Sequence, residues 1–248
     1  MPGGLMMADR AGDRDGLRLD VLHVPLGPVL VAWPAGLVVD TELQGDVVQS
    51  ARWRLLAGAG ATPLFWTSDG HSAGALRAAA HLDSLTRLLA VCGWDGAASE
   101  AGMLRDEMLG GEVPRARFDR FRRRVGRSRN LRAATAGLGR LDAGDVDRLG
   151  LSGPAARAAL AGRGDATGRY RTWLAEIDDA LAGHPVAPAQ GPRGEPGPGS
   201  AALMAAAVEL MVGLDLAAAR VVVASLDPDP DELAAVHATR QDVTRGAS

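Results

Sequence analysis

Four side chains in the amino-terminal third of the sequence are of types that could do chemistry. Asp40 and Glu42 lie in VVDTELQGD at the end of a short apolar run, and Asp69 and His71 lie in TSDGHSAG. Carboxylates at a strand end can hold Mg²⁺ and orient water for phosphodiester cleavage. A strand that gives way to a helix is a common place for a site in α/β proteins. One hypothesis is therefore a small enzyme, a metal-dependent phosphodiester hydrolase, with these four residues in its site.

The tripeptide DTE at residues 40–42 resembles the first acidic motif of DEDD-type exonucleases, although His81 and Asp83 do not match the His-and-Asp motif expected further downstream. The alternative is that these acids favour the amino terminus of a following helix. No spacing of His and Cys matches a metal-ligand signature, so the sequence predicts no metal site and no cofactor.

The segment RARFDRFRRRVGRSRNLR, residues 115–132, concentrates positive charge. It holds nine of the 27 basic residues against one acid, Asp119, although the net charge of the chain is −3. Guanidinium groups bind phosphates in bidentate geometry, which favours nucleic acid as the partner. The alternative is a solvated helix whose arginines pair with acids of this chain or contact an acidic protein surface. The predicted phosphate contacts are Arg115, Arg117, Arg120, Arg122, Arg123, Arg124, Arg127 and Arg129.

The segment VELMVGLDLAAARVVVASL, residues 208–226, resembles a helix-turn-helix, in which a tight glycine turn joins two helices and the second enters the major groove. Only Arg220 on that second helix could read a base or a phosphate, because its other residues are mainly Ala and Val. The alternative is a small helical bundle that packs on the main domain or mediates self-association.

Composition bounds the class of protein. All 27 basic residues are arginine, which is typical of a high-GC genome, so arginine abundance is not by itself a functional signal. The single cysteine, Cys92, excludes an internal disulfide and favours a reducing compartment. The amino terminus lacks the apolar core of a signal peptide, and the apolar stretch 29–39 is too short to span a membrane. We therefore expect a soluble cytoplasmic protein with no membrane association.

Hydrophobic periodicity predicts the elements that would position these residues. Strands are expected from residue 17 through LRLDVLHV, at VLVAW (29–33), at GLVVD (36–40) and at PLFW (63–66). Helices are expected over residues 46–57, 73–91, 99–109, 114–125, 145–148, 153–160, 169–181, 201–212, 216–226 and 230–239.

The order of these elements predicts an α/β (or α+β) amino-terminal unit, a mostly helical region and a small helical carboxy-terminal module. The Pro- and Gly-rich stretch 184–200 predicts a linker. The expected boundaries are a disordered tail (1–16), the α/β unit (17–98), the helical Arg-rich region (99–183), the linker (184–200), the helical module (201–241) and a tail (242–248).

Three functions remain open on the sequence alone. The leading one is a nucleic-acid-associated or regulatory binding protein that uses the arginines of residues 115–132. The second is the small enzyme with the acidic strand-end site. The third is a protein-interaction module without catalysis.

Overall fold

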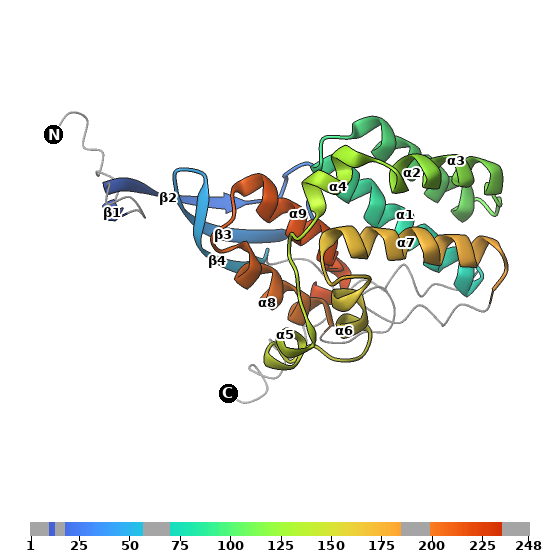
Figure 1. The fold of residues 1–248 in the computed structure, drawn as a ribbon. Helices are drawn as coiled ribbons and strands as arrows, with labels where there is room; N and C mark the ends of the chain where they lie inside the picture. Colours follow the sequence, from blue (N-terminus) through green and yellow to red (C-terminus); the bar gives the residue numbers. More distant parts are fainter. Residues whose placement is uncertain (1–9, 13–17, 57–69, 185–198, 235–248) are drawn as a thin grey trace.

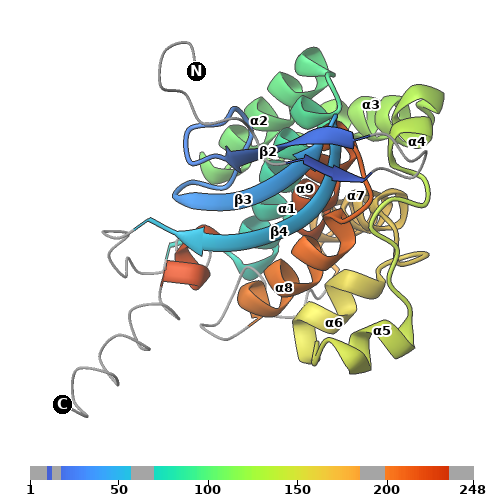
Figure 2. The same ribbon diagram turned by 90° about the vertical axis from the view of Figure 1, so that its left-hand side faces the viewer.

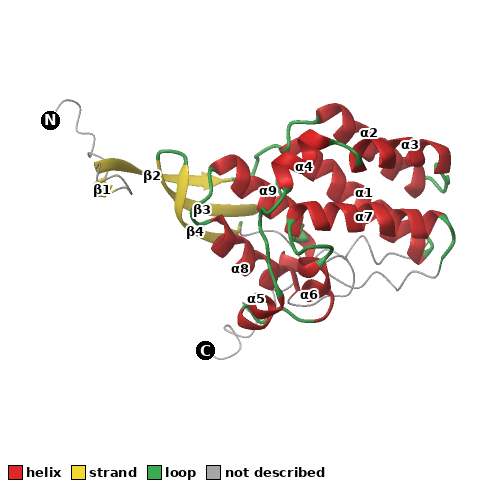
Figure 3. Cartoon of the chain, in the orientation of Figure 1, coloured by secondary structure: helices red, strands yellow, loops and turns green. Residues whose placement is uncertain are grey.

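The computed structural model describes residues 10–12, 18–56, 70–184 and 199–234, and places a small sheet at one end of the molecule and most helices at the other (Figures 1 and 3). The strands are β1 (Arg10–Gly12), β2 (Arg18–Leu26), β3 (Leu37–Gln44) and β4 (Val47–Leu55). The helices are α1 (Ala73–Val91), α2 (Asp95–Leu109), α3 (Arg115–Gly126), α4 (Arg129–Thr135), α5 (Ala143–Arg148), α6 (Gly153–Leu160), α7 (Ala166–Leu181), α8 (Gly199–Met211) and α9 (Leu216–Leu226).

The sheet is an antiparallel meander in the order β1-β2-β3-β4. The β3–β4 hairpin turns at Gly45, whose positive φ of 62° is readily adopted only by a residue without a Cβ. Side chains of β3 alternate between two faces, so Leu37 and Val39 enter the core whereas Asp40 and Glu42 are exposed on the other face. These two acids therefore lie in solvent, although Val38 and Gln44 on the same face of β3 are buried.

Two sequence predictions in this region are wrong. Residues 46–57 were expected to be helical, but residues 47–55 form β4, because β3 supplies a continuous set of backbone partners along them. Their apolar positions fit a half-buried strand as well as a helix. Residues 29–33 were expected to be a strand, but they form the loop between β2 and β3. Pro28 and Pro34 flank this loop and lack ladder donors, and the Trp33 indole donates to the carbonyl of Leu37 at 3.0 Å.

Most helix predictions are confirmed. Helices α1, α6 and α9 have the predicted bounds, α2, α3, α5, α7 and α8 differ by a few residues, and α4 was not predicted. Side chains of Ser72, Asp165 and Asp215 accept backbone N–H groups at the starts of α1, α7 and α9. Such caps satisfy donors that have no partner within the helix, so they fix where each helix begins.

Two hydrophobic cores meet at α9. The first packs the sheet against α8 and α9, and α5 and α6 complete it. The second lies inside the bundle of α1, α2, α3 and α7. Val222 of α9 belongs to the first core and Val221 to the second, because adjacent residues on a helix face different sides. Figure 2, turned so that the strands face the viewer, shows α9 behind the sheet and α8 below β4.

The fold class predicted from the sequence is confirmed: an amino-terminal unit with a small antiparallel sheet precedes a mostly helical region. The expected strand at 63–66, most of the expected linker and most of the tails lie outside the described residues, and the domain boundaries stay a prediction. Among the helices of the described ranges, none is both long and apolar enough to cross a membrane.

Candidate functional site between helices α1 and α7

An acid–base cluster joins α1 to α7, which pack side by side (Figure 1). Arg77 and His81 lie one turn apart on α1 and therefore share a face. Arg77 Nε and Nη2 donate to Oε2 of Glu176 on α7 at 2.9 and 2.7 Å, and His81 Nε2 lies 2.7 Å from the same oxygen. A single carboxylate oxygen thus holds two side chains of α1 against α7.

The surroundings fix the charge states of this cluster. Burial would raise the pKa of Glu176, but the hydrogen bond with His81 and the charge of Arg77 outweigh it and lower that pKa to about 2. Burial lowers the pKa of His81 below its ordinary value, despite the hydrogen bond to Glu176. Glu176 is therefore ionised and His81 is neutral near pH 7. A neutral imidazole that meets a carboxylate donates from Nε2, which leaves a lone pair on Nδ1.

The orientation of the His81 ring is fixed from two sides. Its plane stacks on Trp173 of α7 with 6.4 Å between ring centroids and 18° between planes. Nδ1 is buried and has no hydrogen-bond partner within the described ranges. An oriented neutral imidazole with an open lone pair has the chemistry of a general base, and here it can act only on a group that enters the α1–α7 interface.

A cavity of about 310 Å³, here called the α6–α7 cavity, runs along α7 beside this cluster, and Glu176 belongs to both. Its members come from the loop before α7 and from one face of the first three turns of that helix. They are Gly162, Arg163, Thr167, Gly168, Arg171, Thr172, Ala175 and Glu176.

Two glycines let the loop before α7 approach the helix closely. A Cβ on Gly162, where φ is +65°, would lie 2.6 Å from the Cα of Gly168. A Cβ on Gly168 would lie 2.5 Å from the carbonyl oxygen of Ala161. Any larger residue at either position would push the loop away, so the sequence AGRGDATGR builds this wall of the cavity.

Sequence reasoning missed Arg169, which is 1% exposed. Its guanidinium donates to the carbonyls of Ala159, Gly139 and Gly164 and to Ser225 Oγ. Burial lowers its pKa to about 10, which still leaves it charged. The available signal was its position on the apolar stripe of α7, three residues after Ala166 and four before Trp173.

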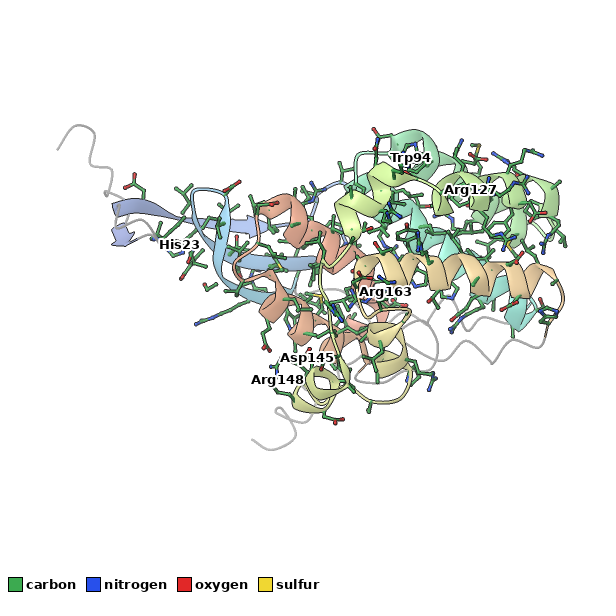
Figure 4. The ribbon with its side chains drawn as sticks, viewed as in Figure 1. His23, Trp94, Arg127, Asp145, Arg148 and Arg163 are labelled. Carbon is green, nitrogen blue, oxygen red and sulfur yellow. The ribbon has the colours of Figure 1, made fainter. Side chains whose placement is uncertain are left out.

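The residues of the predicted acidic enzyme site contact different elements. Asp40 accepts from Arg54 of β4 at 2.8 Å, and Glu42 lies 3.9 Å from His23 of β2, which Figure 4 labels near the outer end of the sheet. His71 Nε2 lies 2.9 Å from the carbonyl oxygen of Leu109 at the end of α2.

Asp69 lies outside the described residues, so the four-residue site stays a prediction. Within the part of the chain that is described, no group of three or more His, Cys, Asp or Glu is placed to hold a metal ion.

Half of the arginines predicted to contact phosphate form ion pairs with acids of this chain. Arg115 and Arg122 both reach Asp178 of α7, at 2.7 and 2.6 Å. Arg117 pairs with Glu107 and Arg124 with Glu100, both on α2. The guanidinium of Arg124 also lies 5.7 Å from the centre of the Trp94 ring. The other four members of the set, Arg120, Arg123, Arg127 and Arg129, are exposed, as is Arg124.

Figure 4 separates the two arginine-bearing regions, with Arg127 beside α3 and Arg163 beside the start of α7. The α3 arginines therefore serve in part to fasten α3 to α2 and α7, as the alternative interpretation of this segment expected.

The helix-turn-helix interpretation is wrong, because α9 is buried between the two cores. Its residues 221–226 are buried, and Arg220 donates to the carbonyl of Val31 in the β2–β3 loop at 3.1 Å. A helix enclosed in this way cannot enter a DNA groove. The glycine turn instead pairs with the sheet edge, where Val48 exchanges backbone hydrogen bonds with Leu214 and Gly213.

Comparison with known proteins finds a similarity of fold. No protein-family model matches the sequence, and no curated protein matches it. The chain is similar to a chain in the solved structure of the membrane-bound sulfane sulfur reductase, an archaeal respiratory membrane complex. The TM-score is 0.59 at 14% sequence identity, over 87% of this chain and 98% of that chain. The two chains therefore share a fold along nearly their whole length.

The expectations about partners are corrected. A fold shared with a chain of a membrane-bound complex conflicts with the prediction of no membrane association and with nucleic acid as the partner. Four of the arginines already pair with acids of this chain, so these four do not support the predicted binding of an acidic protein surface. Self-association through the carboxy-terminal helices is unsupported because α8 and α9 pack on the sheet and the bundle.

Proposed function

We propose that this chain is a subunit of a protein complex that associates with a membrane. The observation that carries the proposal is the similarity in fold, over 87% of this chain, to a chain from an archaeal respiratory membrane complex. The match covers 87% of this chain, so the likeness concerns the fold as a whole and is not limited to one motif.

The β2–β3 loop supplies a contact surface for such a role. Val29 is 93% exposed and Val31 79%, which makes them the most exposed of the large apolar side chains in the described ranges. The hydrogen bonds of Trp33 and Arg220 hold this loop in place. Full burial of a valine contributes about 1.5 kcal/mol or more, so two preformed apolar side chains favour a protein neighbour. The proposal places a neighbouring subunit against this loop.

The test is site-specific photo-cross-linking in the source cells. A photoreactive amino acid replaces Val29 or Val31 in the full chain, and Val113, a 68% exposed valine between α2 and α3, is the matched control. We expect both loop positions to cross-link in the membrane fraction to one partner, which mass spectrometry identifies as a membrane protein or as a subunit of a membrane complex.

Two results would contradict the proposal. One is a chain that fractionates as a monomer away from membranes, with no cross-link from either loop position. The other is the same product from Val113 as from the loop, which would show contact without a defined surface.

A further inference from the structure

Two guanidinium groups border the α6–α7 cavity without an ion-pair partner among the described residues. Arg163 precedes α7 and Arg171 lies on its second turn, and both are exposed. The nearest acid of the cavity, Glu176, is already held by Arg77 and His81. The cavity and its border thus carry three guanidinium groups against one carboxylate, and a neutral His81 adds no charge. This region is electropositive, although the chain as a whole is acidic.

The threonines of the cavity divide into an acceptor and a donor. Thr135 Oγ1 donates to the carbonyl of Leu131 at 2.7 Å, so its only proton is used. Thr167 Oγ1, 2.7 Å from Thr135 Oγ1, must then be the donor of that pair, and it faces the cavity with lone pairs only. Thr172 makes no hydrogen bond through its side chain within the described ranges, so its hydroxyl remains a donor.

The shape of the cavity restricts the ligand. Its polar residues on α7 run from Thr167 to Glu176, which is nine positions and corresponds to about 13 Å of helix. Gly162, Gly168 and Ala175 contribute walls without polar side chains. A volume of about 310 Å³ is at the lower end of the range for small-molecule sites. The cavity therefore suits a small molecule with polar groups at its ends.

We propose that the α6–α7 cavity binds a small organic anion whose carboxylate or phosphate lies between Arg163 and Arg171 and whose hydroxyl group donates toward Glu176. Guanidinium groups bind both kinds of oxyanion through paired hydrogen bonds. Thr172 adds a donor to the anion, and Thr167 accepts from the body of the ligand. This ligand site is independent of the proposed contact at the β2–β3 loop, which lies on β2 and β3 and not on α7.

The test is isothermal titration calorimetry of the full chain with three small probes. Glycerol 3-phosphate and lactate carry the anion as a phosphate ester or as a carboxylate, and glycerol has hydroxyls but no charge. We expect saturable binding of at least one anion and none of glycerol. The anion that binds identifies the class of ligand.

Variants locate the site. Arg163→Gln and Arg171→Gln remove one guanidinium each from an exposed position, so the fold should persist, and circular dichroism verifies it. Each should weaken binding about tenfold, the loss expected for one charge-assisted hydrogen-bonded contact. Arg120→Gln makes the same change on α3 and should leave the affinity unchanged. Amide shifts on ligand addition should be largest at residues 162–176 in the NMR spectrum.

The proposal is overturned if neither anion gives saturable heat. It is also overturned if glycerol binds as well as the anions, or if Arg163→Gln and Arg171→Gln bind like the wild type. Equal weakening by Arg120→Gln would show general attraction to positive charge and would likewise overturn it.

Discussion

Helices α3 and α7 carry their charge in opposite ways. Helix α3 is the densest run of arginine in the sequence, and four of its six arginines pair with acids of α2, α3 and α7 near the surface. Helix α7 has Arg169 fully buried and Glu176 in a shared acid–base cluster. The contribution of a charged side chain to the stability of the fold therefore depends on its burial and its partners. The local density of charge in the sequence does not indicate that contribution.

The largest expected effect comes from Arg169. Arg169→Met removes the donors that satisfy the buried carbonyls of Ala159, Gly139 and Gly164. Each unpaired buried group costs about 1–3 kcal/mol, so we expect a loss of about 3–5 kcal/mol in the free energy of unfolding, measured in urea. Arg171→Met changes an exposed residue of the same helix and should cost less than about 0.5 kcal/mol. Equal losses in the two variants would break the contrast between buried and exposed arginine.

Glu232 is a buried carboxyl that accepts from Ser200 and not from an arginine in the described ranges. Burial raises its pKa to about 7, above the ordinary value of 4.5. A raised pKa favours the protonated form in the folded state, so its contribution is full below pH 4.5 and is lost as the pH rises toward 7.

We expect the wild type to lose about 2–3 kcal/mol of stability across that window relative to Glu232→Gln. Urea unfolding at a series of pH values measures the difference. Parallel curves for the two proteins would show that Glu232 is not the group responsible.

Glu176 should show the opposite dependence on pH. Its pKa is lowered to about 2, so its contribution is present above the ordinary value of 4.5 and is lost as the pH falls toward 2. Glu176→Gln should cost about 1–2 kcal/mol at pH 7, because Arg77 loses an ionised partner, and should remove this acid sensitivity. Asp179→Asn, at a 62% exposed position on the same helix, is the matched control and should leave the stability almost unchanged.

The smallest effect is expected on α3. The side chain of Arg122 is 39% exposed and pairs with Asp178 at 2.6 Å. A double-mutant cycle of Arg122→Gln and Asp178→Asn should give a coupling energy below about 1 kcal/mol that shrinks further in high salt. A coupling as large as the loss at Arg169 would mean that the α3 arginines hold the bundle together more than their exposure suggests.

The sequence predicted most helices because their signals are local. Apolar side chains recur along α1 and α9 at helical spacing, and Asp215 caps α9. It failed over residues 46–57, where the same apolar pattern fits a helix or a half-buried strand and only pairing with β3 decides between them. The α6–α7 cavity was missed for a related reason: Arg163, Arg171 and Glu176 carry no motif, and their common surface arises only when the glycine-rich loop packs on α7.

The net charge and most of the helices could be read from the sequence, because helix signals depend on residues within a turn or two of one another, but α4 was not predicted. Tertiary structure alone decided which arginines are buried, which carboxyls meet a cation, and that α9 packs between two cores. Those outcomes depend on partners far away in the chain, such as Glu176 for His81 and Ser225 for Arg169. Burial also sets the local dielectric environment, which neither composition nor spacing contains.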